Sequence, residues 1–371
     1  MSGPAPIGAG LESNTVVDVV VVGGGSAGLS AAKILARSRR SVLVVDAGTA
    51  RNAPAQGVHN YLYAEGTSPQ QLVTIGRGEA VAYDVQIVEG TATAASVVAS
   101  PAPGGSRFTV ELRTGDGASR AVGARRVVLA TGLVDVLPDV QGLLPRWGRD
   151  VLHCPFCHGW EVRDQAIGVL GTNPMALHQV MLFRQLSDDV VYFQHTAPDP
   201  TDEQREQLAA LGVEHVTGAV AAVEVTDDAL SGVRMVDGRV VARRAVAIAT
   251  GLEARQDLLA DLNLATTELQ LGGMVAGHYL PTDPAGLTAT PGVWAAGNLG
   301  APMAQVITSA AAGSGVGAAI HLDLIGEDTD IAVTALRARR TSRGPDVFSA
   351  AMEAENCERV LGDRRHGLMI P

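Results

Sequence analysis

Two cysteines and a histidine stand together in the segment 154–161, which reads CPFCHGWE. The spacing of Cys154 and Cys157 allows two thiols to close a small disulfide ring and to open it again. In an intracellular protein with strand–helix–strand patterns, such a pair is typical of thiol–disulfide redox chemistry. Half of a zinc site is the alternative, but zinc needs two more suitable ligands and Cys357 is the one remaining thiol. The segment therefore predicts a redox dithiol, and we expect no metal.

Three histidines are candidates for the proton transfers that thiol–disulfide exchange requires. His158 directly follows the second cysteine, and an imidazole titrates near neutral pH, so it can hold or release such a proton. His153 precedes Cys154, and His59 could approach from another part of the chain. An ordinary core or surface role stays open for these two. We expect His158 to join Cys154 and Cys157 as a catalytic residue.

The elements that must position an electron partner begin near the N-terminus. A β-branched run at 16–22 predicts a strand, the pattern at 29–38 predicts a helix, and 41–46 predicts the next strand. Between the first strand and the helix lies a turn with the spacing G-x-G-x-x-G. The turn residues that would contact a nucleotide are Gly23, Gly25, Ser26, Ala27 and Gly28. A dinucleotide is expected there, with its pyrophosphate at the start of the helix.

An acidic residue ends this unit and further turns repeat its pattern. Asp46 lies 18 residues beyond Gly28, close to the spacing at which a carboxylate accepts hydrogen bonds from a ribose. Strands that run into glycine turns recur at 127–132, 166–171 and 247–251. The sequence therefore predicts an α/β protein with two Rossmann-like nucleotide-binding domains.

Taken in their order along the chain, these motifs resemble the low-molecular-weight thioredoxin reductase family of flavoproteins over residues 15–330. The motifs that carry the resemblance are Gly23 to Gly28, Ala130-Thr131-Gly132, the C-x-x-C pair, the second nucleotide-like turn, the second Ala-Thr-Gly at 249–251 and Gly292 to Asn298. The resemblance implies FAD, a homodimer, and a discontinuous FAD-binding domain with a central inserted domain.

The resemblance also suggests borders for the domains. We expect 15–136 and 261–330 to form the two parts of the FAD-binding domain, and 137–260 to form the inserted domain that carries the dithiol. Residues 331–371 would be a C-terminal extension, in which 347–361 has helical, amphipathic spacing. That helix would pack across a dimer or remain a solvated tail.

Within the family, the C-x-x-C segment looks closest to the dithiol oxidases of disulfide natural products, of the gliotoxin and holomycin type. Arg51-Asn52 and the stretch 59–62 also look like this branch. The resemblance makes Cys157 the flavin-side thiol and Cys154 the thiol that exchanges with substrate. Thioredoxin reductases usually place an aspartate where this chain has His158.

The flavin site shows smaller departures from the family pattern. Gly297 keeps the glycine of its motif, whereas Asn298 stands where an aspartate commonly binds the ribityl chain. An amide can still donate and accept hydrogen bonds there. Gln305 begins a helix whose N-terminal dipole would favour negative charge on the reduced flavin, or it is simply a helix cap.

The second nucleotide turn departs most from the family. Asn173 replaces the middle glycine and would crowd a pyrophosphate, and Pro174 removes a backbone N–H donor. The stretch 192–199 contains no arginine for the 2′-phosphate of NADPH. NADPH is therefore doubtful, although a variant loop helped by Arg184 remains an alternative.

Composition limits the classes of partner. The 371 residues carry a net charge of −11, which argues against nucleic acid. Residues 1–14 show no signal-peptide pattern. The run at 304–322 is built of small residues with Gln305, which suits a buried helix better than a membrane span. A cytoplasmic protein with no membrane partner is expected.

Three functions are compatible with these observations, and the first is favoured. It is an FAD-dependent oxidase that forms a disulfide in a small-molecule dithiol and reduces O₂ to H₂O₂. The second is an NADPH-dependent, thioredoxin reductase-like disulfide reductase. The third is a non-enzymatic flavin redox sensor whose C-terminal segment, with Cys357, docks a partner.

Overall fold

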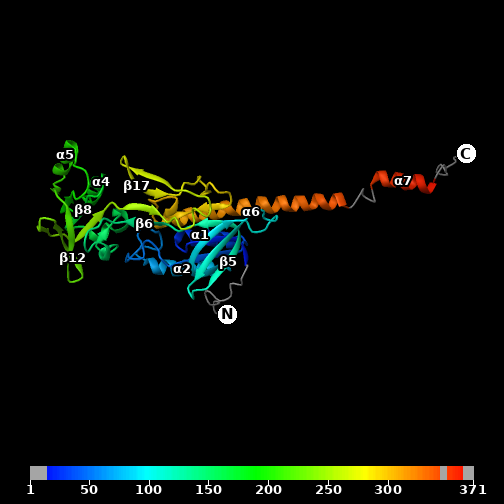
Figure 1. Ribbon diagram of the computed structural model, residues 1–371, viewed down its shortest axis with the longest axis horizontal. Coiled ribbons are helices and arrows are strands. Elements are labelled where there is room, and N and C mark those ends of the chain that lie inside the picture. The colour runs from blue at the N-terminus through cyan, green and yellow to red at the C-terminus, as the bar shows by residue number, and fades with distance from the viewer. Residues whose placement is uncertain (1–14, 343–348, 362–371) are drawn as a thin grey trace. The chain divides into compact units, whose positions relative to one another are not determined.

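The structure is a computed structural model that describes residues 15–342 and 349–361. The chain divides into two compact units, residues 1–321 and 322–371. The first unit contains both parallel sheets predicted from the glycine turns (Figure 1). Each sheet has its own buried core. The α/β class is therefore confirmed, and each of these sheets positions one of the two nucleotide-like turns, after β1 and after β8.

The first sheet collects strands from both ends of the first unit. Its parallel part has the order β3-β2-β1-β5-β18. The strands are β1 (Val16–Val22), β2 (Val42–Asp46), β3 (Gln86–Val97), β5 (Ser119–Leu129) and β18 (Val293–Ala295). Because β18 pairs with β5 after a long intervening stretch of chain, the first domain is discontinuous, as predicted.

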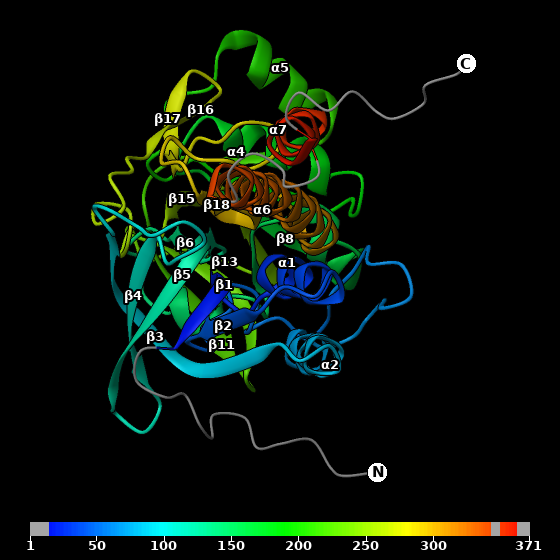
Figure 2. The ribbon, with the colours of Figure 1, turned by 90° about the vertical axis from the view of Figure 1, so that its right-hand side faces the viewer.

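Helices cover this sheet through close backbone packing. Helix α1 (Ser26–Arg37) follows the first glycine turn, and α6 (Val306–Ser342) packs on it (Figure 2). A Cβ atom at Gly313 would stand 2.0 Å from the carbonyl oxygen of Ala27. The small residues predicted over 304–322 therefore serve helix packing, although the helix begins at Val306 and continues to Ser342. Helix α2 (Pro69–Val81) follows β2 along the chain.

The second sheet is wholly parallel and lies between β5 and β18 in the sequence. Its order is β10-β9-β8-β14-β7. The strands are β7 (Val151–Leu152), β8 (Ile167–Leu170), β9 (Val190–Phe193), β10 (Glu214–Val216) and β14 (Ala245–Ile248), and the connecting helices are α4 (Met175–Phe183) and α5 (Asp202–Ala210). The four residues of β8, β9 and β14 are all buried, which explains their unbroken apolar sequences.

Two short strands carry the chain from one domain to the other. β6 (Leu133–Val136) and β15 (Gly251–Ala254) pair antiparallel, with Gly251 opposite Val136. Strand β6 begins directly after the first Ala-Thr-Gly motif, and β15 begins at the glycine of the second. Because the strands are antiparallel, with Leu133 opposite Ala254, the two motifs lie at opposite ends of this pair. The C-x-x-C pair lies just after β7, where α3 (Pro155–His158) begins.

Strand β4 (Phe108–Thr114) extends the first sheet. A smaller sheet consists of β11 (Val220–Thr226), β12 (Ala229–Met235) and β13 (Val240–Val241), and another joins β16 (Thr267–Leu271) and β17 (Met274–Tyr279) to β15 and β6. The domain borders expected at residues 136, 260 and 330 stay predictions. Close to the second of these borders, Ala254, Leu258 and Leu259 pack with the core of the first sheet.

The C-terminal helix α7 (Ala350–Leu361) lies within the stretch predicted to be helical. The start of that stretch falls outside the described residues. Among the helices of 15–342 and 349–361, none combines the length and apolar character needed to span a bilayer.

Candidate active site

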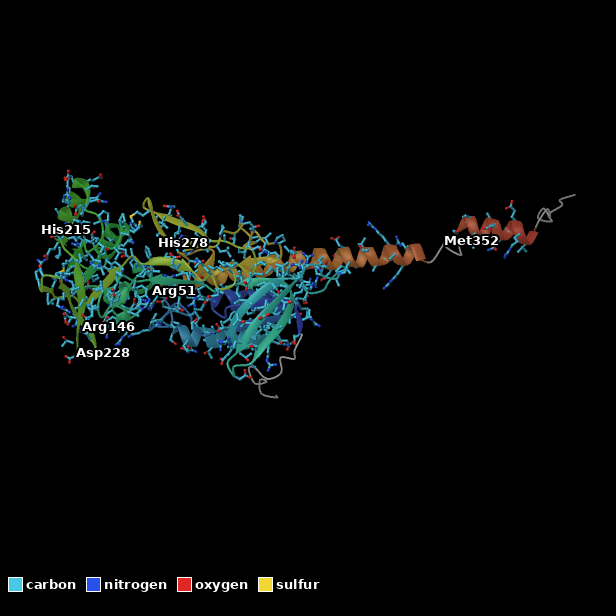
Figure 3. The ribbon with its side chains drawn as sticks, in the orientation of Figure 1. Arg51, Arg146, His215, Asp228, His278 and Met352 are labelled. Carbon is cyan, nitrogen blue, oxygen red and sulfur yellow. The ribbon has the colours of Figure 1, made fainter. Side chains whose placement is uncertain are left out.

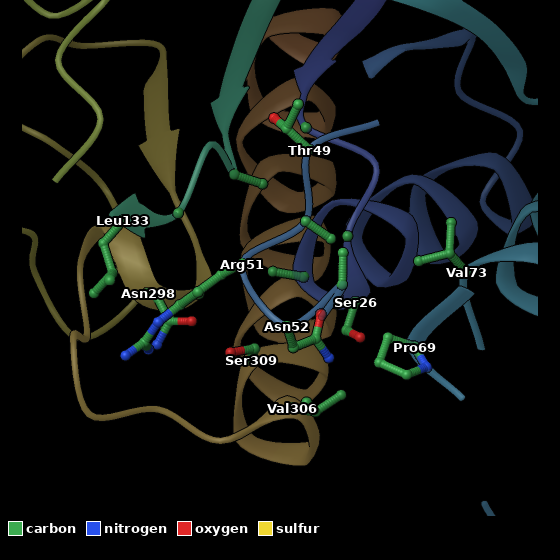
Figure 4. Close-up of a pocket in the computed structure, with 18 of the residues that line it drawn as sticks. Ser26, Thr49, Arg51, Asn52, Pro69, Val73, Leu133, Asn298, Val306 and Ser309 are labelled. Carbon is green, nitrogen blue, oxygen red and sulfur yellow. The ribbon is translucent and has the colours of Figure 1, made fainter. Parts of the chain in front are cut away.

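A cavity of about 500 Å³ opens where β1, β2 and β5 end (Figure 4). The predicted cofactor residues in its wall are Gly23, Gly25, Ser26, Ala27, Asp46, Ala130, Thr131, Gly132, Gly297, Asn298 and Gln305. The candidate redox residues in the same wall are His59, His153, Cys154, Cys157 and His158. One cavity thus brings together the nucleotide turn and the dithiol. Gly28 alone among the predicted cofactor residues lies outside the wall.

The first glycine turn owes its shape to close backbone contacts. Gly23 has a φ of +108°, and a Cβ there would lie 2.3 Å from the carbonyl oxygen of Ala130. A Cβ at Gly28 would lie 1.9 Å from the carbonyl oxygen of Gly23, so Gly28 serves the packing of helix on strand. A Cβ at Gly25 would meet no atom within 4 Å, because this residue faces the open cavity. That space at a helix start suits a pyrophosphate.

Two polar atoms in the wall lack a protein partner. The hydroxyl of Thr131 and the Nε of Arg77 are buried without a hydrogen bond. Arg77 also donates to Asp46 at 2.6 Å and to Glu89 at 3.0 Å. Buried polar atoms in proteins are nearly always hydrogen-bonded, so these two fit a polar ligand such as the ribose and phosphates of FAD. Asp46 stands at the end of β2, where its carboxylate can still accept from a ribose.

We expect Gly25→Val to weaken FAD binding roughly tenfold, which corresponds to about 1.4 kcal/mol of binding free energy. The backbone of Gly25 is extended (φ −78°, ψ −173°), so valine fits the fold while its side chain enters the cavity. The measurement is the ratio of flavin to protein absorbance after purification. Gly78→Val is the matched control, since Gly78 has equally open surroundings outside the cavity. Equal flavin content in both variants would contradict this placement of FAD.

The residues after β18 hold the other end of the cavity. The amide of Asn298 donates to the carbonyl oxygens of Ala301, Pro302 and Ala304, at 3.3, 3.0 and 2.8 Å. Its nitrogen therefore braces the loop that leads into α6, and its oxygen is left as an acceptor. The carbonyl of Gln305 accepts from the Ser309 N–H at 2.8 Å, so Gln305 caps α6 as well as lining the cavity.

The two thiols are chemically unequal because of where α3 begins. Cys154 lies at the N-cap, and its carbonyl accepts from the N–H groups of Cys157 at 3.2 Å and His158 at 3.1 Å. A hydrogen bond from the Cys157 thiol, opposed by burial and aided by the N–H groups of Cys157 and Phe156, lowers the pKa of Cys154 to about 7. The same hydrogen bond, together with burial, raises the pKa of Cys157. A thiol of lower pKa is more often present as the nucleophilic thiolate and leaves faster, which is the reactivity we expect of Cys154.

Alkylation of the reduced protein should report this inequality. Because the folded pKa of Cys154 is depressed, its thiolate is present above about pH 7 and is lost below it. The rate of reaction with iodoacetamide is expected to rise with a midpoint near pH 7, against about 8.5 for an ordinary thiol. Peptide mass spectrometry would assign the early label to Cys154. A first label on Cys157, or a midpoint near 9, would contradict the assignment.

His158 belongs to a cluster of imidazoles and carboxylates. Its ring meets that of His59 edge to face, with centroids 6.0 Å apart. His59 in turn lies 2.6 Å from Glu65 and 3.4 Å from Glu161. Burial, and then the charge of His59, lower the pKa of His158, whereas Glu161 acts to raise it. The net effect keeps His158 neutral near pH 7, in the form that accepts a proton.

His153 belongs to a hydrogen-bond network that is separate from the cluster around His158. Its Nδ1 lies 3.3 Å from the Thr250 hydroxyl, which donates to Asp135 at 2.9 Å. Arg51, which is labelled in Figure 3, binds both carboxylate oxygens of Asp135 at 2.6 Å. Burial acts to raise the pKa of Asp135, but Arg51 outweighs it and the net pKa is lowered. Burial lowers the pKa of His153, so this ring stays neutral and positions the segment before Cys154.

The second nucleotide turn is closed to a nucleotide, because the side chain of Asn173 is hydrogen-bonded to the surrounding backbone. Asn173 accepts from the Met175 N–H at 2.9 Å and donates to the Ala249 carbonyl at 2.9 Å. Pro174 occupies the N-cap of α4. The N–H that a phosphate would use at this helix start is therefore already bonded, which supports the doubt about NADPH.

The loop after β9 offers no replacement for the missing arginine. His195 accepts from the Val220 N–H at 3.0 Å, and Gln194 contacts both His215 and Asp199. Arg184, considered from the sequence as a phosphate ligand, instead pairs with Asp188 and donates to the Leu211 carbonyl at 2.9 Å. The contacts of Arg184 therefore give no support to the alternative of an NADPH-binding loop helped by this residue.

Several site residues were not singled out from the sequence. Arg77, Asp135 and Glu161 contact Asp46, Arg51 and His59 from distant parts of the sequence, whereas Glu65 contacts His59 from a neighbouring position. Apart from His59, which is a candidate for proton transfer, the stretches at 51–52 and 59–62 are marked in the sequence only by their likeness to one branch of the family. Acidic residues beside those stretches were the available signal for Glu65.

Comparisons with known proteins agree with this geometry. The chain matches the family described as pyridine nucleotide-disulphide oxidoreductase over residues 17–314. Thioredoxin reductase sirT of Leptosphaeria maculans is 30% identical over 336 residues, which cover 85% of this chain and 96% of that protein. The match to a probable thioredoxin reductase of Arthroderma benhamiae, 34% identical over 177 residues, spans 47% of this chain and only 43% of that relative.

Solved structures give the same assignment. The crystal structure of HlmI is 39% identical, with a TM-score of 0.78, and covers 89% of this chain and 100% of its own. An oxidoreductase from Agrobacterium tumefaciens is 33% identical, with a TM-score of 0.75 and coverage of 84% and 99%. The chain therefore belongs to the pyridine nucleotide-disulphide oxidoreductase family, as a thioredoxin reductase-like, FAD-dependent oxidoreductase.

Proposed function

We propose that this protein oxidises a small-molecule dithiol to a disulfide through Cys154 and Cys157, and that O₂ is the final electron acceptor. The observation that carries the proposal is the second nucleotide turn, where the Asn173 side chain accepts from the Met175 N–H that a phosphate would otherwise use. The first nucleotide turn, in contrast, opens onto a cavity that both cysteines line. Electrons are then expected to enter through the cysteines.

The protein residues perform two exchange steps. A substrate thiolate attacks Cys154 of the Cys154–Cys157 disulfide and releases Cys157 as a thiolate. The second substrate thiol, after losing its proton, attacks the substrate sulfur of the mixed disulfide and expels Cys154. The product is a substrate disulfide, while the enzyme gains the electron pair as a dithiol. The lowered pKa of Cys154 speeds the second step, because a thiol of low pKa leaves faster.

His158 is the proposed proton acceptor for the substrate thiols. Its lowered pKa leaves the imidazole neutral, and it lines the cavity beside Cys157. The first glycine turn would hold FAD, and bound FAD would supply an acceptor for the electron pair of the enzyme dithiol and a route to O₂, with H₂O₂ as the product. The likeness to HlmI at 39% identity supports the choice of a small dithiol, and a homodimer is proposed from the family.

Oxygen consumption tests the proposal. The purified, FAD-containing protein should consume one O₂ for each dithiol oxidised and form H₂O₂ in equal amount, without NADPH. A small dithiol such as dithiothreitol is the first probe. Absence of peroxide, with oxygen uptake no faster than that of free FAD, would overturn it.

A disulfide reductase that uses NADPH is the second candidate. The names of the relatives favour it, since sirT is described as a thioredoxin reductase. It requires the closed turn at Asn173 to open for a nucleotide. Stoichiometric reduction of the flavin by NADPH, at a rate that supports turnover, would establish it.

A further inference from the structure

A short loop at residues 58–67, between β2 and α2, is closed by its own hydrogen bonds. The Val58 N–H donates to the Thr67 carbonyl oxygen at 2.8 Å, where the two ends of the loop meet. Inside the loop, Asn60 has the left-handed φ of +59°, which asparagine adopts more readily than most residues. Its N–H donates to a carboxylate oxygen of Glu65 at 2.9 Å. The loop itself therefore sets where the Asn60 side chain lies.

The Asn60 side chain reaches the segment between the two cysteines. Its amide nitrogen donates to the Phe156 carbonyl oxygen at 2.6 Å, although the two residues are 96 positions apart in the sequence. Phe156 lies in the single turn of α3, and carbonyl groups in the last turn of a helix need partners from outside the helix. Asn60 supplies that partner for Phe156.

The Phe156 carbonyl belongs to the same peptide unit as the Cys157 N–H. Because a trans peptide unit is planar, its C=O and N–H point in opposite directions, and holding one group also directs the other. The Cys157 N–H points toward Cys154, whose carbonyl oxygen accepts from it at 3.2 Å. The pKa of Cys154 is lowered first by the hydrogen bond from the Cys157 thiol, against the effect of burial, and then by this N–H.

His59 attaches the same loop to the redox segment at a second point. Its Nδ1 lies 2.6 Å from one carboxylate oxygen of Glu65, and its Nε2 lies 3.4 Å from Glu161, which follows α3. Glu65 thus holds His59 with one oxygen and the Asn60 N–H with the other. The loop is therefore attached to the redox segment on both sides of Cys157.

We propose that Asn60 is a positioning residue for the redox turn, which holds the peptide unit between Phe156 and Cys157 so that the Cys157 N–H faces Cys154. The inference rests on the proposed function for the step that it serves, the expulsion of Cys154 from the mixed disulfide. An N–H that is held toward the sulfur stabilises the negative charge that develops there. Donation to the Phe156 carbonyl also polarises the peptide unit and strengthens its N–H as a donor.

Alkylation of Cys154 in the reduced protein tests this role without any turnover. Asn60→Gly removes the amide but keeps a residue that adopts the left-handed conformation freely, so the loop retains its shape. The midpoint of iodoacetamide labelling should rise by about one pH unit, toward the value of about 8.5 for an ordinary thiol. Asn263→Gly is the matched control, because Asn263 has a φ of +56°, is exposed and does not line the cavity. Its midpoint should equal that of wild type.

Anaerobic bleaching of the flavin by dithiothreitol gives a second measurement on the same variants. Asn60→Gly should keep its full flavin content and bleach roughly three- to tenfold more slowly than wild type, because a thiol of higher pKa leaves more slowly. A labelling midpoint that is unchanged in Asn60→Gly, or that rises equally in Asn263→Gly, would overturn this inference alone. A midpoint raised only in Asn60→Gly would support it even if wild type failed to oxidise dithiols, a result that would overturn the proposed function.

Discussion

Replacing Cys154 or Cys157 with serine is expected to cut dithiol oxidation to no more than about 10⁻³ of the wild-type rate, because a hydroxyl cannot take part in disulfide exchange. FAD should stay bound in both variants. The cofactor contacts expected from the cavity lie on the first glycine turn and near Asn298, away from α3.

The two variants should also differ from each other. Cys154→Ser removes the thiol with the lowered pKa, so no mixed disulfide with substrate can form. Cys157→Ser leaves the Cys154 thiolate able to attack a linear disulfide such as glutathione disulfide, which releases one glutathione, and mass spectrometry should detect the trapped adduct on Cys154. Cys357→Ser is the matched control, since Cys357 is exposed on α7, and its turnover should equal that of wild type. Loss of FAD from both active-site variants would show that the cysteine pair is misplaced.

Replacing His158 with alanine is expected to slow dithiol oxidation by 10²- to 10⁴-fold, the usual range for a general acid or base. The pKa of His158 is lowered by burial, so the neutral imidazole is the form present at neutral pH. Protonation as the pH falls through that pKa removes the acceptor. The wild-type rate should therefore drop on acidification, and the variant should lose this dependence.

A pH profile of the oxidation rate that extends well below pH 6.5, from about pH 4.5 to 8, measures this effect. His178→Ala is the control, because His178 is exposed on α4 and does not line the cavity. Equal rates for wild type and His158→Ala across this range would reject the role. A slow variant with an unchanged pH profile would instead indicate that His158 positions the cysteine pair.

Local patterns in the sequence predicted the two parallel sheets and the turn at Gly23 to Gly28. These features depend on neighbours along the chain: a β-branched strand, glycines where backbone atoms approach closely, and a helix start. The discontinuous first domain came from the resemblance, and β18 pairing with β5 confirms it.

Contacts between distant parts of the chain could not be predicted in the same way. The ion pair of Arg51 with Asp135 joins residues 84 positions apart, and that of Arg77 with Asp46 joins residues 31 apart. Nothing local in the sequence marks such partners. Asn173 illustrates the intermediate case: its departure from glycine is visible in the sequence, whereas its bond to the Met175 N–H depends on the folded turn.

The direction of electron flow is the central claim, and anaerobic flavin absorbance tests it most directly. The oxidised, FAD-containing protein is mixed without oxygen, in separate experiments, with dithiothreitol and with NADPH. The account predicts rapid bleaching of the flavin by the dithiol, with bleaching by NADPH slower by about two orders of magnitude or more, a difference of roughly 2.7 kcal/mol. Rapid stoichiometric bleaching by NADPH, with none by the dithiol, would contradict it.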